Sequence, residues 1–470
     1  MTMNKAVFFP LVAALIAPVA SSSAQSVGPL EAIQQRLDLL EQQNANLRSE
    51  LRMIRDELER VKQTGSASAE VTRLDALEEK VDLQTTRLTE HDLVKAESSQ
   101  RVPVRLTGMI LFNAFRNSRH ANPARDYPLY AAATAATTPN AGGTLRQSLI
   151  GLDFHTPEGI LGGQFNASVL FDIFGLSDSG GDRPVAISLN TSPRLRTAWV
   201  EGRWRNRSLL AGLANSIVSP RQPSSLAEVF VPPLSGAGNL YGWRQQVRFE
   251  QRAHIGEGQE MVGQIAVVQT AEDWPRVQTA FASTLETKRP GLEAHVGFSH
   301  VFDEKRRIEI GSALHRSETH VAAIAIPSRV YSFDWFVSPA AQLELSGMVF
   351  AGENVGNLAG RNAYSFTILT PRPGEIRGIA VREHGGWAQV AFKATPRLTL
   401  NVYSGLEDPN DDDAVALDGV TRNLTGAANM FFRLAPNVVT GFEIAQTRTL
   451  YKAGQHPRLN HYDIYVAYLF

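Results

Sequence analysis

Apolar residues follow two different periods along the chain, and the change falls near residue 100. Between residues 30 and 61 they recur at spacings of three and four, which is the heptad pattern of a coiled coil. Beyond Pro103 the period is two, as in strands with one apolar face. The change predicts an α-helical coiled coil over residues 25–100 and an all-β domain over residues 101–470.

The heptad segment is expected to associate with copies of itself, because a lone helix would leave its apolar stripe in water. Asn44 is the one polar residue in this core frame. A buried amide at such a position selects register and oligomeric state, whereas the alternative is a surface asparagine on a lone helix. The residues expected at the helix contact are Leu37, Leu40, Asn44, Leu47, Leu51, Ile54 and Leu58.

The first 24 residues have the organisation of a secretory signal peptide. Lys5 precedes an apolar run over residues 6–20, and Ser22, Ser23 and Ala24 supply the small residues of a cleavage site. A membrane anchor is the alternative, but the apolar run is short and is followed by polar residues. We therefore expect cleavage after Ala24. The sequence contains no cysteine, which suits export through an oxidising compartment.

Sixteen segments of alternating apolar and polar residues follow Pro103. In the segment 163–173, for example, Phe165 and Phe171 alternate with Asn166 and Asp172. A length of about ten residues lets a tilted strand cross a bilayer. The predicted strands are 104–115, 146–155, 163–173, 195–205, 207–215, 240–252, 260–270, 290–300, 305–316, 328–338, 341–351, 384–394, 397–406, 421–433, 437–448 and 460–470.

Short and long connections alternate strictly between these segments, with residues 395–396 typical of the short ones and residues 216–239 of the long ones. Tight periplasmic turns and long extracellular loops give this pattern in outer-membrane barrels. A β-sandwich would not alternate in this way, and no propeller repeat of 40 to 50 residues is present. The sequence predicts an all-β transmembrane β-barrel of sixteen antiparallel strands in the outer membrane of a Gram-negative cell, with the coiled coil in the periplasm.

Charge and composition narrow the class of function. The 46 basic and 47 acidic residues give a net charge of −1, which argues against a nucleic-acid partner. The eleven histidines are scattered and form no Ser-His or Asp-His pattern, so we expect no enzyme, no cofactor and no metal. The acidic run over residues 408–413 is interpreted as a solvated loop, with Ca²⁺ binding as the alternative.

The segment 240–252 carries the candidate channel residues. Arg244, Arg248 and Arg252 share one face, and Val247 and Phe249 lie on the other. An arginine facing lipid at the bilayer centre costs about 2–4 kcal/mol, so this row is expected to face the lumen and to attract anions. Further candidates are Arg105, Arg196 and Arg221, the last in a segment, 216–239, that we expect to constrict the channel.

Lumenal acids could instead neutralise these arginines, because the numbers of inward-facing acids and bases nearly balance. Further cations are expected on the lumenal face at Arg307, Lys393, Arg397 and Arg433. The acids expected to face the lumen are Asp153, Asp172, Glu201, Glu293, Glu309, Glu344 and Glu443. Anion preference therefore depends on where the two signs of charge cluster.

The chain ends in YDIYVAYLF, which resembles the assembly signal of outer-membrane proteins. Further short motifs are LRTAWVE at 195–201, LLAG at 209–212, Asn215-Ser216, GGWAQ at 385–389, and GFE at 441–443 with Thr447. These motifs resemble those of the DcaP-like porins of Gram-negative bacteria. The order of signal peptide, coiled coil and barrel also matches over the whole chain. One departure is Leu213, where family members often carry glutamine.

The resemblance implies a trimeric, water-filled channel for passive diffusion of small hydrophilic solutes, favouring anions such as dicarboxylates. Its expected partners are outer-membrane lipid, lipopolysaccharide and further copies of this chain. The alternative function is a structural or plugged barrel, tethered through the periplasmic coiled coil and without transport.

Overall fold

The computed structural model describes residues 104–119, 121–123, 126–133, 138–156, 162–175, 192–270, 279–286, 289–360, 365–413 and 419–470. All of them belong to the second of the two units into which the chain divides, residues 93–470. The predicted signal peptide and coiled coil, with Asn44 and its apolar neighbours, lie outside the described residues. No helix among the described residues is long and apolar enough to cross a membrane.

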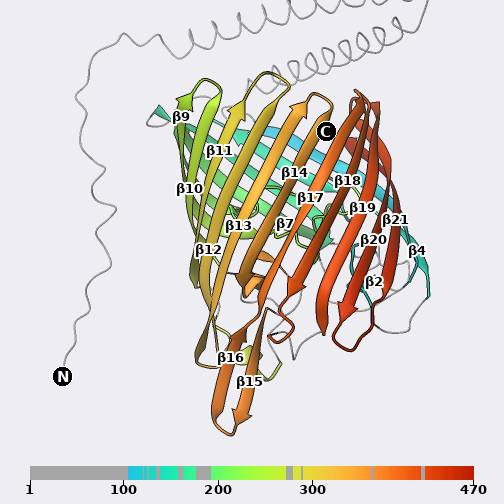
Figure 1. The fold of residues 1–470 in the computed structure, drawn as a ribbon. Coiled ribbons are helices and arrows are strands. Elements are labelled where there is room, and N and C mark those ends of the chain that lie inside the picture. The colour runs from blue at the N-terminus through green and yellow to red at the C-terminus, as the bar shows by residue number, and fades with distance from the viewer. Residues whose placement is uncertain are drawn as a thin grey trace, which may run out of the picture. The chain divides into compact units, whose positions relative to one another are not determined.

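Sixteen long antiparallel strands within this described part close into a barrel, as the alternation predicts (Figure 1). Each strand pairs with the next along the chain, and the last pairs with the first. The strands are β1 (Val104–Asn117), β5 (Leu149–His155), β6 (Gln164–Gly175), β7 (Ser192–Trp204), β8 (Arg207–Asn215), β9 (Trp243–Gly256), β10 (Gln259–Gln269), β11 (Pro290–Val301), β12 (Arg307–Val321), β13 (Ile324–Ala340), β14 (Leu343–Glu353), β17 (Arg382–Thr395), β18 (Leu398–Pro409), β19 (Val420–Ala435), β20 (Val438–Tyr451) and β21 (Arg458–Leu469).

Smaller elements lie between these strands. The short strand β4 (Asn140–Thr144) pairs with β1 beyond the end of β5, so β4 and β5 share one position in the barrel wall. Two hairpins are formed by β2 (Ala121–Pro123) with β3 (Pro128–Ala131) and by β15 (Phe366–Arg372) with β16 (Glu375–Ala380). The 3₁₀ helices are η3 (Thr279–Thr284) and η4 (Val355–Leu358).

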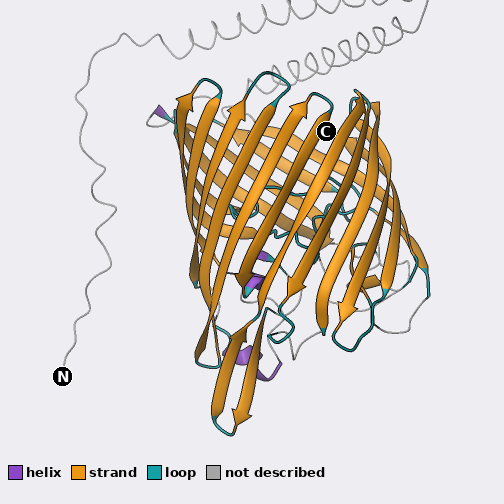
Figure 2. Ribbon diagram, viewed as in Figure 1, coloured by secondary structure: helices purple, strands orange, loops and turns teal. Residues whose placement is uncertain are grey.

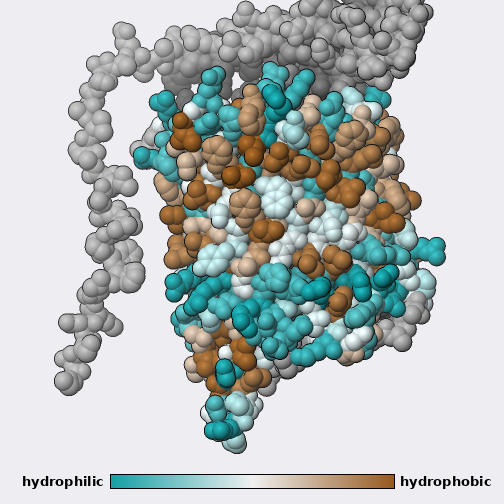
Figure 3. All heavy atoms as spheres, in the orientation of Figure 1, coloured by the Kyte–Doolittle hydropathy of each residue, from teal (hydrophilic) through white to brown (hydrophobic). Residues whose placement is uncertain are grey.

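The strands place apolar residues outside the barrel and polar residues inside it. On β9, Val247 is 53% exposed whereas Arg244 is 5% exposed, because successive side chains point to opposite faces. Figure 3 shows apolar residues gathered over the outer surface of this face and a hydrophilic band nearer the long connections. This arrangement is what a lipid-facing surface requires.

The short turns lie at one end of the barrel and the long connections at the other (Figure 2). Three predicted long connections differ from the structure. The connection expected over residues 116–145 contains the β2–β3 hairpin and β4, which pairs with β1. The loop expected over residues 317–327 is a tight turn at Ala322 and Ala323, because β12 and β13 extend past the predicted ends. The connection expected over residues 352–383 contains the β15–β16 hairpin, which projects beyond the barrel (Figure 1).

Candidate channel constriction

Residues 216–242, which connect β8 to β9, lie inside the barrel, and we call them the inward loop. Residues 230–241 of this loop are all buried. A loop buried in this way must find hydrogen-bond partners for its backbone, since an unpaired buried polar group costs free energy. Inward-facing side chains of the wall supply many of these partners, and they determine the path of the loop.

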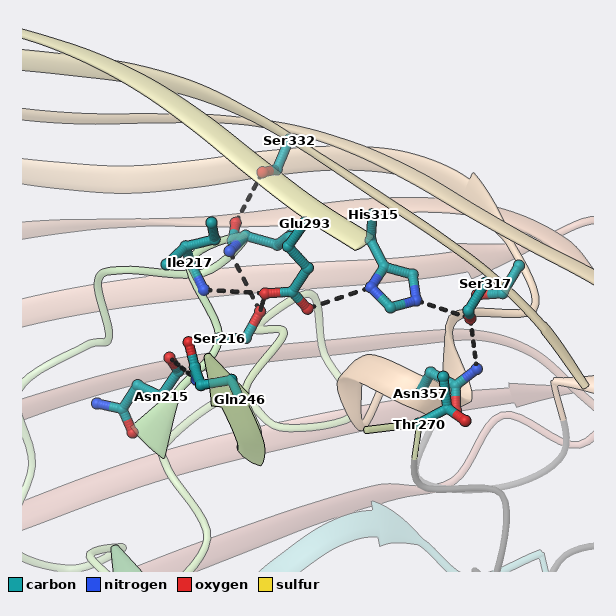
Figure 4. Close-up of polar contacts among 12 residues, drawn as sticks. Asn215, Ser216, Ile217, Gln246, Thr270, Glu293, His315, Ser317, Ser332 and Asn357 are labelled. Carbon is teal, nitrogen blue, oxygen red and sulfur yellow. Dashed lines mark hydrogen bonds and ion pairs between the residues drawn. The ribbon is translucent and has the colours of Figure 1, made fainter. Parts of the chain in front are cut away.

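The first anchor of the inward loop is the carboxylate of Glu293 on β11 (Figure 4). Its Oε2 accepts hydrogen bonds from the Ser216 hydroxyl at 2.9 Å and from the Ile217 backbone N–H at 3.2 Å. The hydroxyl of Ser332 on β13 donates to the carbonyl oxygen of Val218 at 2.7 Å. Three successive residues of the loop are therefore attached to two strands.

A chain of side chains continues from Glu293 to the connection after β14 (Figure 4). His315 Nδ1 lies 3.1 Å from Glu293 Oε1, and His315 Nε2 lies 2.9 Å from Ser317 Oγ. Asn357 Nδ2 donates to the same Ser317 oxygen at 3.1 Å. The order serine, histidine, carboxylate is that of a hydrolase triad. Here Ser317 is buried, and its hydroxyl oxygen accepts a hydrogen bond from Asn357. We therefore assign these four side chains to anchoring the inward loop and not to catalysis.

Arg221 is the second anchor. Its Nε lies 2.9 Å from Asp334 Oδ1 on β13, and its Nη2 lies 2.5 Å from Glu309 Oε2 on β12. His295 on β11 contacts the other oxygen of Asp334 at 3.2 Å. Two carboxylates therefore match the charge of Arg221, which makes it a structural cation of the loop rather than an unpaired one.

The remaining contacts of the inward loop continue around the wall in the order of the strands. They begin at β11 and β13, pass β17, β20 and β1, and end at β7, so residues 216–229 nearly encircle the lumen. After the two anchors, the bonds are Ser224 N to Gln389 Oε1 (2.7 Å), Ser225 Oγ to Glu443 Oε2 (2.6 Å), Asn113 Nδ2 to Leu226 O (2.8 Å), Gln147 Nε2 to Ala227 O (2.6 Å) and Arg196 Nη1 to Val229 O (2.9 Å).

The second half of the inward loop fills one side of the lumen. Leu234, Ala237 and Leu240 belong to an apolar core that also contains residues of β12 to β19. Gly238 adopts a left-handed φ of 94°, and its Cα lies against the backbone carbonyls of Gly386 and Leu406, where a Cβ would not fit. The loop therefore packs directly on the backbone of β17 and β18, and space remains on the opposite side.

That remaining space is a pocket of about 460 Å³ beside β7, β8 and β9. Two tryptophans from the wall and Gln222 from the inward loop line it together with charged residues. The charged residues that line the pocket are Arg196, Glu201, Arg203, Arg248, Glu250 and Arg252. Four arginines and two glutamates give this part of the lumen an excess of positive charge.

Ion pairs neutralise only part of this charge. Arg203 pairs with Glu201, and Arg252 pairs with Glu250, each at 2.7 Å. Arg248 forms no ion pair with a described residue, and its buried Nε has no hydrogen-bond partner among them.

Arg196 has a carboxylate nearby, but that carboxylate is shared. Asp172 lies 2.5 Å from Arg194 and 3.9 Å from Arg196, so it is already engaged by the nearer arginine. Arg196 and Arg248 are therefore the pocket cations least matched by acids.

Most acids that were expected to oppose these arginines lie elsewhere. Glu293 and Glu443 are each 1% exposed, and both hold the inward loop. Glu309 pairs with Arg221, and Glu344 pairs with Lys393 at 2.6 Å. These four acids therefore bind the inward loop or other cations, and the acids left in the pocket are Glu201 and Glu250.

The structure brings together three of the six predicted channel residues. Arg196, Arg248 and Arg252 line the pocket. Arg244 faces inward but is buried and does not line it. Arg105 lies at the short-turn end of β1, opposite Asp153.

Trp199, Arg203, Gln222 and Trp243 also line the pocket and are not among the residues predicted from the sequence. Alternation with Glu201 places Trp199 and Arg203 on the inner face and could have found them. Simple alternation would instead place Arg196 on the outer face. Arg196 reaches the same pocket because the pairing of β6 with β7 skips this residue at a bulge, which reverses the alternation.

The acidic run over residues 408–413 is partly neutralised. Asp408 pairs with Arg422 at 2.5 Å, and Asp413 pairs with Arg382 at 2.6 Å. The hydrogen bond from Arg382 holds the pKa of Asp413 below its usual value. Within the described residues, no three histidine, aspartate or glutamate side chains are grouped to hold a metal ion.

Comparison with known proteins gives structural matches only. No family model and no curated protein matches the sequence. The outer membrane channel DcaP of Acinetobacter baumannii aligns with a TM-score of 0.59 at 16% identity, covering 78% of this chain and 97% of that one. An anion-selective porin from Comamonas acidovorans aligns with a TM-score of 0.50 at 11% identity, covering 78% of this chain and all of that one. The barrel thus has the fold of the DcaP channel and of outer-membrane porins.

Proposed function

We propose that the chain is an outer-membrane porin through which small hydrophilic solutes diffuse passively. The observation that carries this proposal is the pocket left open beside the inward loop, lined by four arginines within a closed barrel. The exposed apolar outer surface supports placement in a membrane, and the fold shared with the DcaP channel supports the outer membrane. We propose no enzymatic role.

We infer that the channel favours anions. Arg196 and Arg248 face a space that the inward loop narrows, while Glu293 and Glu443 are covered by that loop. Charges in a narrow channel walled by protein act more strongly than charges in bulk water. An anion passing the pocket is therefore attracted by guanidinium groups that few acids oppose.

Small carboxylates, including dicarboxylates, are the solutes that we propose. A guanidinium group can bind a carboxylate through two parallel hydrogen bonds, and in the pocket Arg248 has no ion pair with a described residue while Arg196 shares its one acid with Arg194. The resemblance to DcaP-like porins supports the same class of solute.

We further propose that residues 1–24 are removed, that residues 25–100 form a periplasmic coiled coil, and that three copies assemble around it. The heptads and Asn44 support self-association, and the resemblance supports the number three. Deleting residues 25–100 should leave a barrel that inserts and conducts but holds its trimer less well. A truncated barrel that cannot insert would contradict this role.

The channel proposal is tested by conductance in a planar bilayer, with the reversal potential measured across a salt gradient. The wild-type protein should close in steps of three and prefer anions. R196Q/R248Q should lower the anion-to-cation permeability ratio about twofold or more, because two of the four positive charges that line the pocket are lost. The control is R382Q, which removes a paired arginine from outside the pocket and should leave the ratio unchanged.

Three results would contradict the proposal. A silent bilayer would favour the alternative, a plugged or structural barrel. Cation selectivity of the wild-type protein would agree with a porin but would contradict the role proposed for the pocket arginines. An R196Q/R248Q ratio equal to that of the wild type would also show that the pocket does not select ions.

A further inference from the structure

Two arginines of neighbouring strands lie directly opposite each other on the outer surface of the barrel. Arg448 on β20 is paired in register with Arg458 on β21. Their neighbours Thr447, Thr449 and Leu459 are buried inside the barrel, so the alternation turns both arginines outward. Like charges directly opposite on two strands destabilise the pair unless an anion lies between or beside them.

No acid of the described barrel supplies that anion. Neither arginine forms an ion pair with a described residue, and the covered Nε of Arg448 has no hydrogen-bond partner among them. The only acids from residue 419 to the end of the chain are Glu443 and Asp463, and both are buried inside the barrel. A covered donor without an acceptor is costly, which points to a missing partner.

Nearby residues extend the positive charge. On the adjacent strands, Arg422 of β19 and Arg116 of β1 also face outward. Arg422 holds the nearest outward acid, Asp408 of β18, at 2.5 Å. The outer surface from β19 to β1 therefore carries several arginines and no free carboxylate among the described residues.

The position of the pair indicates what kind of anion would reach it. Leu424 lies opposite Arg448 on its other side, and Ile444 and Ile464 lie nearer the middle of the strands, where all three are exposed on the apolar surface. The arginines thus lie at the loop end of the exposed apolar surface of these strands. In a bilayer this is the depth of lipid headgroups.

We propose that Arg448 and Arg458 form a site for the phosphate group of an outer-leaflet lipid. Guanidinium groups bind phosphate oxygens through paired, charge-assisted hydrogen bonds, and two such groups side by side match a phosphate monoester. The inference rests on the outer-membrane location proposed above. Free inorganic phosphate shares this chemistry, but the site opens on the surface that the lipid covers.

A second pair of arginines with the same geometry provides a control. Arg316 on β12 lies directly opposite Arg329 on β13, also outside the barrel. There the charge is opposed, because Glu353 lies 3.4 Å from Arg329 and Glu318 is on the same strand as Arg316. Substituting either pair removes the same two charges from the same kind of position.

The test is the affinity of the full-length mature protein, in non-ionic detergent, for lipid A with two phosphates, measured by titration in native mass spectrometry. R448Q/R458Q should bind lipid A about tenfold more weakly, because charged hydrogen bonds are lost, whereas R316Q/R329Q should bind within about twofold of the wild type. Lipid A without phosphates should bind the wild type as weakly as lipid A binds R448Q/R458Q.

Several outcomes would overturn the site. These are equal weakening by both double variants, no difference between phosphorylated and dephosphorylated lipid A, or inorganic phosphate competing as well as lipid A. If R448Q/R458Q does not fold, R458Q alone should still weaken binding about threefold.

Planar-bilayer conductance of the same samples separates this test from that of the channel. Both double variants should conduct as the wild type does, because neither pair of arginines faces the lumen. A silent wild type that still binds lipid A would leave the lipid site standing while the channel proposal fails.

Discussion

Arg221 of the inward loop and Asp334 of β13 form an ion pair, with 2.9 Å between Nε and Oδ1, that crosses from the loop to the barrel wall. Asp334 is almost fully buried and also contacts His295, while Glu309 holds the far end of the guanidinium group. One side chain thus fixes the loop to two strands and places its single positive charge between two lumenal acids.

We predict that R221Q widens the channel and makes it less selective for anions. The substitution removes hydrogen bonds to charged groups, each contributing about 1.5–3 kcal/mol, and leaves Asp334 without an arginine and Glu309 with Arg307 alone. Single-channel conductance should rise and the reversal potential should shift toward cations. R382Q, which removes one outward-facing arginine, should change neither value. Unchanged conductance and selectivity in R221Q would mean that the other contacts hold the loop without Arg221.

Gly238 tests whether close packing holds the second half of the inward loop. In G238A a Cβ would meet the carbonyl oxygens of Gly386 and Leu406, and the left-handed φ of 94° adds about 1–2 kcal/mol of strain. We predict a lower unfolding temperature and a changed conductance. G454A is the matched control, because Gly454 has a φ of 82° but open space around it. Equal effects of the two substitutions would show that backbone strain alone, and not packing, is responsible.

Tyr127 should make the contact between residues 126–131 and the inward loop sensitive to alkaline pH. Its ring meets the rings of Phe174 and Phe230 at 5.2 Å, and burial, reinforced by Asp126, raises its pKa to about 12. Because the pKa of Tyr127 in the folded protein is higher than its value of about 10 in the unfolded chain, the buried neutral ring contributes its full stability to the fold below about pH 10. This stability is lost as the pH rises toward 12, and it amounts to roughly 3 kcal/mol.

The measurement is a titration of phenolate absorbance in the wild type and in Y127F. The difference between the two curves isolates one of the ten tyrosines and should show a transition near pH 12. A transition near pH 10 would place Tyr127 in solvent and contradict the packing against Phe230.

The barrel could be predicted from the sequence because a bilayer forces apolar residues onto one face of every strand. Segments such as Gln164–Gly175 alternate with few exceptions, and the lengths of the connections then determine the order of strands. Arg248 could be placed in the lumen by the same reasoning, because Val247 and Phe249 beside it are apolar, and the structure exposes both on the outer surface. Contact with lipid therefore restricts the residue type at each outward-facing position of the strands.

The interior could not be predicted in the same way, because the partners of the inward loop are single polar residues on strands far apart in the sequence. Nothing local distinguishes Gln389, which binds Ser224, or Glu443, which binds Ser225, from any other lumenal side chain. The position of Arg196 in the pocket depends on a bulge that reverses alternation within β7. The loop contacts and the bulge depend on how all sixteen strands of the closed barrel are arranged, which no local stretch of sequence determines.

The turn between β12 and β13 could not be predicted either, because its two central residues are alanines. Ala322 and Ala323 both adopt left-handed backbone conformations, with φ of 49° and 63°, in a two-residue turn that usually contains Asn-Gly. Alanine gives no turn signal, so a long loop was expected here. A322N/A323G should raise the free energy of unfolding by about 1 kcal/mol or more, since left-handed alanine is strained. Glycine at the neighbouring strand position, in A325G, should instead lower it by about 0.5–1 kcal/mol. Denaturant unfolding of both variants measures the difference, and a destabilised A322N/A323G would show that the turn does not have this conformation.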